Sequence, residues 1–141
     1  MRAELAPAQA ACAQARDEHQ AAIERREALD AQIQSYHERI AAMLGGSETF
    51  SIESLHACRR YLDELDARRP AMQAEVDRAL QAVHTSDARL TDLRRRIAQN
   101  RGRIDVVGRR IVKLRNLIEA EAVDAEDEEA EEQALARLAR R

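Results

Sequence analysis

The side chains that could do chemistry in this sequence are few and far apart. No histidine has a second metal ligand at helical spacing, and the histidines and cysteines are His19, His37, His56, His84, Cys12 and Cys58. The sequence also lacks a glycine-rich phosphate loop and a Gly-x-Ser-x-Gly nucleophile elbow. We therefore predict that the protein is not an enzyme, that it holds no metal or cofactor, and that both thiols are free.

The composition favours long helices over a compact core. Aromatic residues make up 2% and charged residues 35% of the 141 residues, which is typical of helices that bury a narrow seam. The amino-terminal residues carry charges that a secretory signal does not tolerate, and no run reaches the ~18 apolar residues of a membrane span. We therefore expect a cytoplasmic protein.

An apolar repeat organises the second half of the chain. Alternate steps of three and four residues from Leu62 to Ile118 pass through 17 positions, of which 14 are apolar, and the register never slips. A seven-residue repeat held over so many turns is typical of a coiled-coil helix that packs one face against a partner.

The same spacing predicts a first helix over about residues 3–44. Gly45 and Gly46 are suited to end this helix, because glycine readily takes the left-handed conformation found after a helix. Ser51 is suited to cap a second helix over about residues 52–120. Two helices joined by so short a turn fold back on each other.

The predicted fold class is all-α, a long two-helix antiparallel coiled-coil hairpin with the second helix longer. We expect the hairpin to occupy residues 1–120, with its turn at about 45–51. Residues 119–132 hold nine acidic side chains and no basic one. Because such a block repels itself, we expect residues 121–141 to form an acidic tail that is frayed or disordered.

The unequal helix lengths leave part of the second helix without a partner. In this hairpin Leu5 faces about residue 91, so the second helix continues for another ~27 residues, or ~40 Å. That part carries apolar seam residues, here called the C-terminal stripe: Leu93, Ile97, Ile104, Val107, Ile111, Leu114 and Ile118. An apolar stripe of this length predicts a surface that binds a partner.

Basic residues surround the C-terminal stripe. Residues 94–115 contain nine basic side chains against Asp105 alone. The arginines of this basic face are Arg94, Arg95, Arg96, Arg101, Arg103, Arg109, Arg110 and Arg115. One interpretation is a solvated helix surface with the acids as counterions, and another is electrostatic steering toward an acidic partner. Nucleic acid is disfavoured, because the region has no aromatic residue to stack on bases and the neighbouring acids repel phosphate.

In layout and in a cluster near the turn, the chain is similar to a known family. Apolar and aromatic residues gather there: Tyr36, Ile40, Phe50, Leu55, Tyr61 and Leu62. With this cluster and a second helix that outruns the first, the chain resembles the central stalk proteins of bacterial type III secretion systems, the FliJ family of flagella and the YscO family of injectisomes.

The resemblance implies a non-catalytic stalk in the pore of the hexameric secretion ATPase, at the cytoplasmic face of the inner membrane. The terminal ends would enter the ring. The turn end would contact the export gate protein through Tyr36, Phe50, Leu55, Tyr61 and Leu62. Chaperones of secreted substrates are further implied partners, and such a stalk is peripheral to the membrane through its partners.

Self-association is the alternative function. Two C-terminal stripes could pair antiparallel and bury each other in a homodimer with twofold symmetry, which would make the chain a structural scaffold or tether. A stable dimer that Ile104→Asp or Ile111→Asp separates would favour this alternative. A monomer that stimulates ATP hydrolysis by a partner hexamer would favour the stalk.

Overall fold

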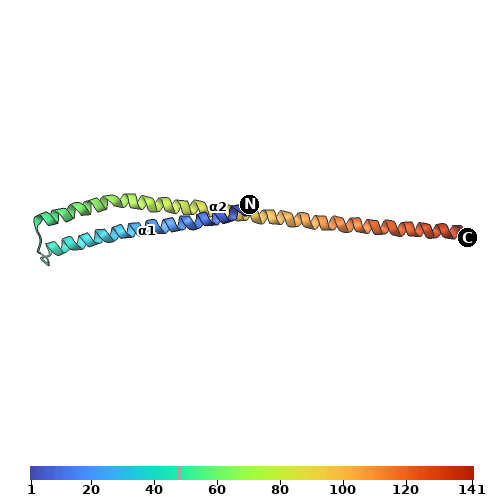
Figure 1. The fold of residues 1–141 in the computed structure, drawn as a ribbon, viewed down its shortest axis with the longest axis horizontal. Helices are drawn as coiled ribbons and strands as arrows, with labels where there is room; N and C mark the ends of the chain where they lie inside the picture. Colours follow the sequence, from blue (N-terminus) through green and yellow to red (C-terminus); the bar gives the residue numbers. More distant parts are fainter. Residues whose placement is uncertain (48) are drawn as a thin grey trace. The chain divides into compact units, whose positions relative to one another are not determined.

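The computed structural model describes residues 1–47 and 49–141, which form two helices joined by a short turn. α1 spans Arg2–Leu44 and α2 spans Ile52–Ala139. Their lengths of 43 and 88 residues confirm the predicted hairpin with a longer second helix. In Figure 1, α1 runs beside the green and yellow part of α2.

The hairpin forms the first of two structural units, Met1–Arg94. Its buried residues follow the three-four spacing on both helices. Those of α1 are Ala8, Cys12, Ala15, Ala22, Leu29, Ile33 and Met43. Those of α2 are Leu55, Cys58, Leu62, Leu65, Val76, Leu90 and Leu93. Each lies on the predicted seam or on its continuation toward the turn, and both cysteines are free, as predicted.

The turn is built by the residues that the sequence assigned to it. Gly46 has a φ of +78°, the left-handed conformation, and the Ser47 N–H donates to the Ala42 carbonyl at 3.2 Å. This bond satisfies one of the carbonyls left open at the end of α1. Residue 48, inside the predicted turn, lies outside the described residues.

Ser51 caps the start of α2. Its Oγ accepts a hydrogen bond from the Ser54 backbone N–H at 3.1 Å, so one of the four unpaired N–H groups of the first turn is satisfied. Glu53 adds an acidic side chain to that turn, where the helix dipole favours negative charge. Local chemistry therefore defines where α2 begins.

Cross-helix pairs fix the antiparallel register. Near the turn, the rings of Tyr36 and Tyr61 lie 4.8 Å apart, centroid to centroid. Further along, Arg69 bonds Asp30 at 3.2 Å, and a third pair joins Arg16 to Asp87 at 2.9 Å. The sequence-based register, in which Leu5 faces about residue 91, places Arg16 opposite about residue 80. The observed partner Asp87 lies a few residues beyond that position.

The second unit, Arg95–Arg141, is the carboxyl-terminal part of α2. Its helix continues through the acidic residues to Ala139, where the sequence led us to expect a frayed or disordered tail. The reason is composition: after Gly108 this segment has no Gly or Pro and is rich in Ala, Glu, Leu and Arg. Their helix propensities outweigh like-charge repulsion, which costs only a few tenths of a kcal/mol per pair.

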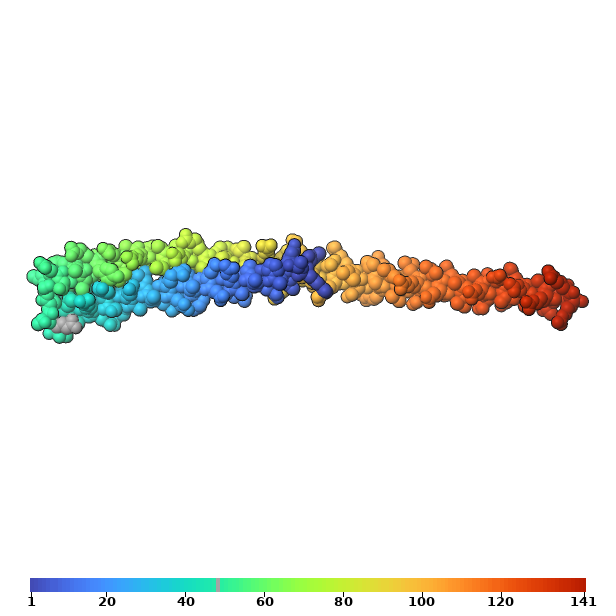
Figure 2. Space-filling view, viewed as in Figure 1, coloured from blue at the N-terminus to red at the C-terminus, as the bar shows by residue number. Residues whose placement is uncertain are grey.

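Every residue from Ala98 to Arg141 is exposed. In Figure 2 this segment is coloured orange to red. Across residues 1–47 and 49–141, neither helix has a stretch long and apolar enough to cross a membrane. Over the same residues, no three His, Cys, Asp or Glu side chains are grouped so that they could hold a metal ion.

Ser51→Ala should destabilise the hairpin by about 1 kcal/mol, because the Ser54 N–H loses its acceptor. Ser47→Ala is the matched control, since Ser47 is exposed and its backbone N–H bond to Ala42 is kept. Urea unfolding followed by circular dichroism measures both. Equal effects of the two substitutions would contradict the capping role.

Candidate partner-binding surface

Most of the C-terminal stripe is open to solvent. Five of its members are exposed: Ile104 60%, Val107 53%, Ile111 46%, Leu114 58% and Ile118 64%. All lie on the second unit at three- and four-residue spacing, so they share one side of the helix. A row of large apolar side chains left in water is unfavourable and marks a surface for a partner.

The first two members of the C-terminal stripe differ from the rest. Leu93 is buried and belongs to the hairpin unit, so it is a core residue and is not available to a partner. Ile97 is half-buried. The sequence led us to expect the free stripe to begin at Leu93, and the structure places this residue in the core of the hairpin. The part that remains open runs from Ile104 to Ile118.

Other exposed apolar residues of this segment were missed by the sequence analysis. They are Val106, Val112, Leu117, Val123, Leu135 and Leu138. A search along one seam passes over them because they lie on other sides of the helix. Val106 and Leu117 are separated by close to three helical turns and share a second, shorter apolar side.

The basic face is fully exposed from Arg94 to Lys113. The Nε of Arg109 donates to the backbone carbonyl of Asp105 at 3.4 Å, so this side chain lies along its own helix. A shallow hollow of about 700 Å³ is lined by Ile104, Asp105, Gly108, Arg109, Val112, Lys113 and Asn116. At Gly108, one of the lining residues, a Cβ would meet nothing within 4 Å. This surface combines apolar contact area with guanidinium groups, which suits binding of an acidic partner.

The turn-end residues of the sequence analysis fall into two groups. Leu55 and Leu62 are buried, and Tyr36 and Tyr61 are half-buried and pack on the same core clusters. These four hold the hairpin together. Phe50 is 41% exposed and is the only one of the five predicted contacts that stands largely open to a partner.

Two apolar residues beside Phe50 were not singled out from the sequence. Leu44, the last residue of α1, is 57% exposed, and Ile52, the first of α2, is 71% exposed. Both are terminal residues of their helices and lie off the seam, so the seam spacing gives no signal for them. With Phe50 they form an exposed apolar tip, here defined as Leu44, Phe50 and Ile52.

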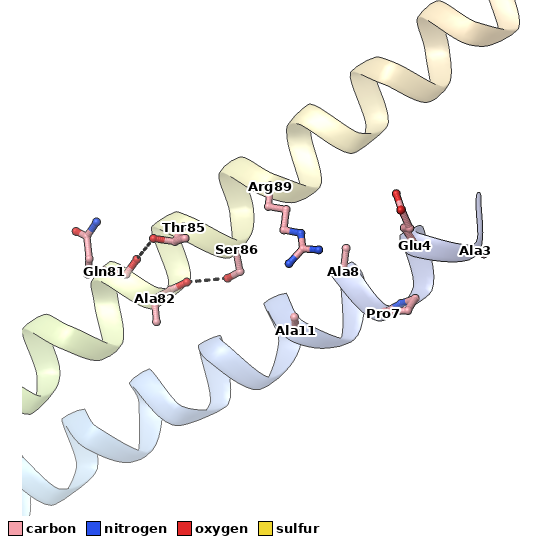
Figure 3. Close-up of a pocket in the computed structure, with 10 residues that line it drawn as sticks. All are labelled: Ala3, Glu4, Pro7, Ala8, Ala11, Gln81, Ala82, Thr85, Ser86 and Arg89. Atoms are coloured by element: carbon pink, nitrogen blue, oxygen red, sulfur yellow. Dashed lines mark hydrogen bonds between the residues drawn. The ribbon is translucent and has the colours of Figure 1, made fainter. Parts of the chain in front are cut away.

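A groove of about 530 Å³ lies between the helices near the amino terminus of α1. Figure 3 shows Pro7, Ala8 and Ala11 on one side, with Thr85 and Ser86 on the other. The hydroxyl of Thr85 donates to the Gln81 carbonyl at 3.0 Å, and that of Ser86 donates to the Ala82 carbonyl at 2.8 Å. Because the alanines are small and the hydroxyls are satisfied by their own helix, the groove marks loose packing.

The comparisons with known proteins agree with the resemblance seen in the sequence. The model of a family described as "Bacterial type III secretion protein (HrpB7)" matches residues 1–140. The match covers nearly the whole chain and confirms the prediction of a type III secretion protein. No curated protein and no solved structure matches the chain.

Phe50 and Leu55 should respond differently to truncation. Leu55→Ala should lower the free energy of unfolding by about 2–3 kcal/mol, because it opens a cavity in the cluster with Met43 and Cys58. Phe50→Ala should change it by less than about 0.5 kcal/mol. Chemical denaturation of both variants checks this, and a large loss from Phe50→Ala would show that Phe50 is a core residue.

Proposed function

Because the chain belongs to the HrpB7 family of bacterial type III secretion proteins, we propose that it is the non-catalytic central stalk of a secretion ATPase complex. In this function its carboxyl-terminal helix inserts into the pore of the hexameric ATPase. The turn end contacts the export gate protein. The stalk couples the ring to the gate and helps deliver secreted proteins and their chaperones.

The observation that carries the proposal is the open part of the C-terminal stripe. Its five residues from Ile104 to Ile118 are at least 46% exposed and lie in a helix that has no Gly or Pro after Gly108. A single helix with apolar residues on several sides can contact a ring from within, because a ring surrounds the helix. Val106, Leu117 and Val112, which lie off the stripe, extend the contact area around the helix.

Charge supports the same partner. Residues 94–115 carry a net charge of +8, from nine basic side chains and Asp105. A field of this strength attracts an acidic lining and speeds association at low salt. Arginine side chains also keep their charge when they lose water, which suits an enclosed pore.

The apolar tip supports the contact at the turn end. Leu44, Phe50 and Ile52 are exposed large hydrophobic residues at the turn end of the hairpin. Such residues fit a shallow apolar site on a gate protein or a chaperone, since small apolar clusters often anchor interfaces. With these partners, the protein would lie in the cytoplasm, at the cytoplasmic face of the inner membrane.

Ile111→Asp should impair the stalk. The test mixes the full chain with the purified ATPase of the same secretion system and measures ATP hydrolysis as the chain is titrated. The concentration needed for half-maximal stimulation should rise about tenfold or more, because an isoleucine buried in the complex is replaced by a charge.

Val123→Asp is the matched control, since Val123 is also exposed but lies off the stripe, beyond Ile118. It should shift the half-maximal concentration less than Ile111→Asp does. Absence of any stimulation by the unaltered chain would contradict the stalk function. Equal shifts for the two variants would show that the stripe is not the contact.

A further inference from the structure

We propose that the second units of two copies of this chain, residues 95–141, pair side by side in antiparallel orientation. In this dimer Ile111 of one copy lies opposite Leu114 of the other. The pairing covers the open part of the C-terminal stripe with an identical stripe. It does not depend on the proposed function, because it requires only the purified chain.

The second unit divides into two halves of opposite charge, which select the orientation. Residues 95–115 carry a net +7, from eight basic side chains and Asp105, and residues 119–132 carry nine acids and no base. Parallel pairing places basic half against basic half and acidic half against acidic half. Antiparallel pairing places each basic half against an acidic half, so only this orientation is electrostatically favourable.

The charged residues on the two flanks of the stripe also favour the antiparallel orientation. Charged residues on the flanks of an apolar heptad seam set partner orientation. In a parallel pair, Arg110 faces Arg115 of the second copy, and Asp124 faces Glu129. In an antiparallel pair each flank meets the same flank of the second copy, so basic residues of one half can face acidic residues of the other.

The register follows from apolar and charged contacts together. With Ile111 opposite Leu114, Val107 falls opposite Ile118, and each contact occurs twice by symmetry. The same register places Arg103 opposite Asp124 of the second copy. Four of the five exposed stripe residues thus contact apolar residues of the second copy. The ion pair between Arg103 and Asp124 lies beside these contacts.

Neighbouring registers are worse. A shift of one heptad toward the carboxyl terminus places Ile111 opposite Glu121 of the second copy. It also places Arg115 of one copy opposite Arg115 of the other, so two positive charges face each other. A shift of one heptad toward the amino terminus places Arg110 of one copy opposite Arg110 of the other, which again is repulsive. The chosen register instead places Arg115 over Gly108 of the second copy, where a Cβ would have open space and the arginine has room.

A charge exchange tests both the orientation and the register. Arg103→Glu and Asp124→Arg are each introduced into the full chain, and the dimer dissociation constant is measured by sedimentation equilibrium. Each single variant should weaken the dimer about tenfold, because two symmetric ion pairs become two repulsive contacts. The double variant should return the constant to within about threefold of the original, because opposite charges face each other again.

The matched control is the double variant Arg109→Glu, Glu119→Arg. It exchanges the same charges at positions that lie away from the flanks of the stripe, so the dissociation constant should stay within about threefold of the original. Circular dichroism shows whether each variant keeps its helix content.

Several outcomes would overturn the pairing. If the chain stays monomeric at about 100 µM, the proposed dimer does not form, and the stripe binds a different protein. A trimer or larger oligomer contradicts the twofold contact. A double variant that stays as weak as the single variants excludes this register.

Discussion

An apolar seam needs a second surface along its whole length, and this requirement shapes the molecule. The three- and four-residue spacing of the α2 seam holds from Leu55 to Ile118, while α1 has only 43 residues. Burial ends near Ile97, and the next seam residues stand in water. Because exposed apolar area is costly, the same repeat that folds the hairpin also creates a need for a partner.

Packing within the hairpin is uneven, and the difference follows from side-chain size. Near the turn, Leu29, Ile33, Leu62 and Leu65 form a tight cluster, and Leu65 is fully buried. Toward the amino terminus the seam of α1 becomes Ala8, Cys12 and Ala15, and a groove opens beside it. Cross-helix pairs such as Arg16–Asp87 are exposed on both sides, so they set register more than they add stability.

Periodicity predicted the fold well because burial in a hairpin depends on one face of each helix. The helix boundaries at Leu44 and Ile52 followed from Gly46 and Ser51, whose roles are local. In the acidic tail the structure is helical to Ala139, where like-charge repulsion led us to expect fraying or disorder. Leu55 and Leu62 were assigned to a partner, yet they are buried, since sequence spacing does not distinguish an internal contact from an external one. The exposed tip residues lie off the seam and carried no periodic signal.

Hydrogen exchange of the backbone amides tests the central claim most directly, namely that the apolar residues from Ile104 to Ile118 are exposed to solvent in the single chain. At high dilution, amides of residues 29–40 and 55–65 should exchange slowly, and those of residues 104–118 should exchange much faster because no packing holds that part of the helix closed. Protection of residues 104–118 should appear when the chain is concentrated or its ATPase partner is added. Equal protection of both regions in the dilute monomer would contradict the account.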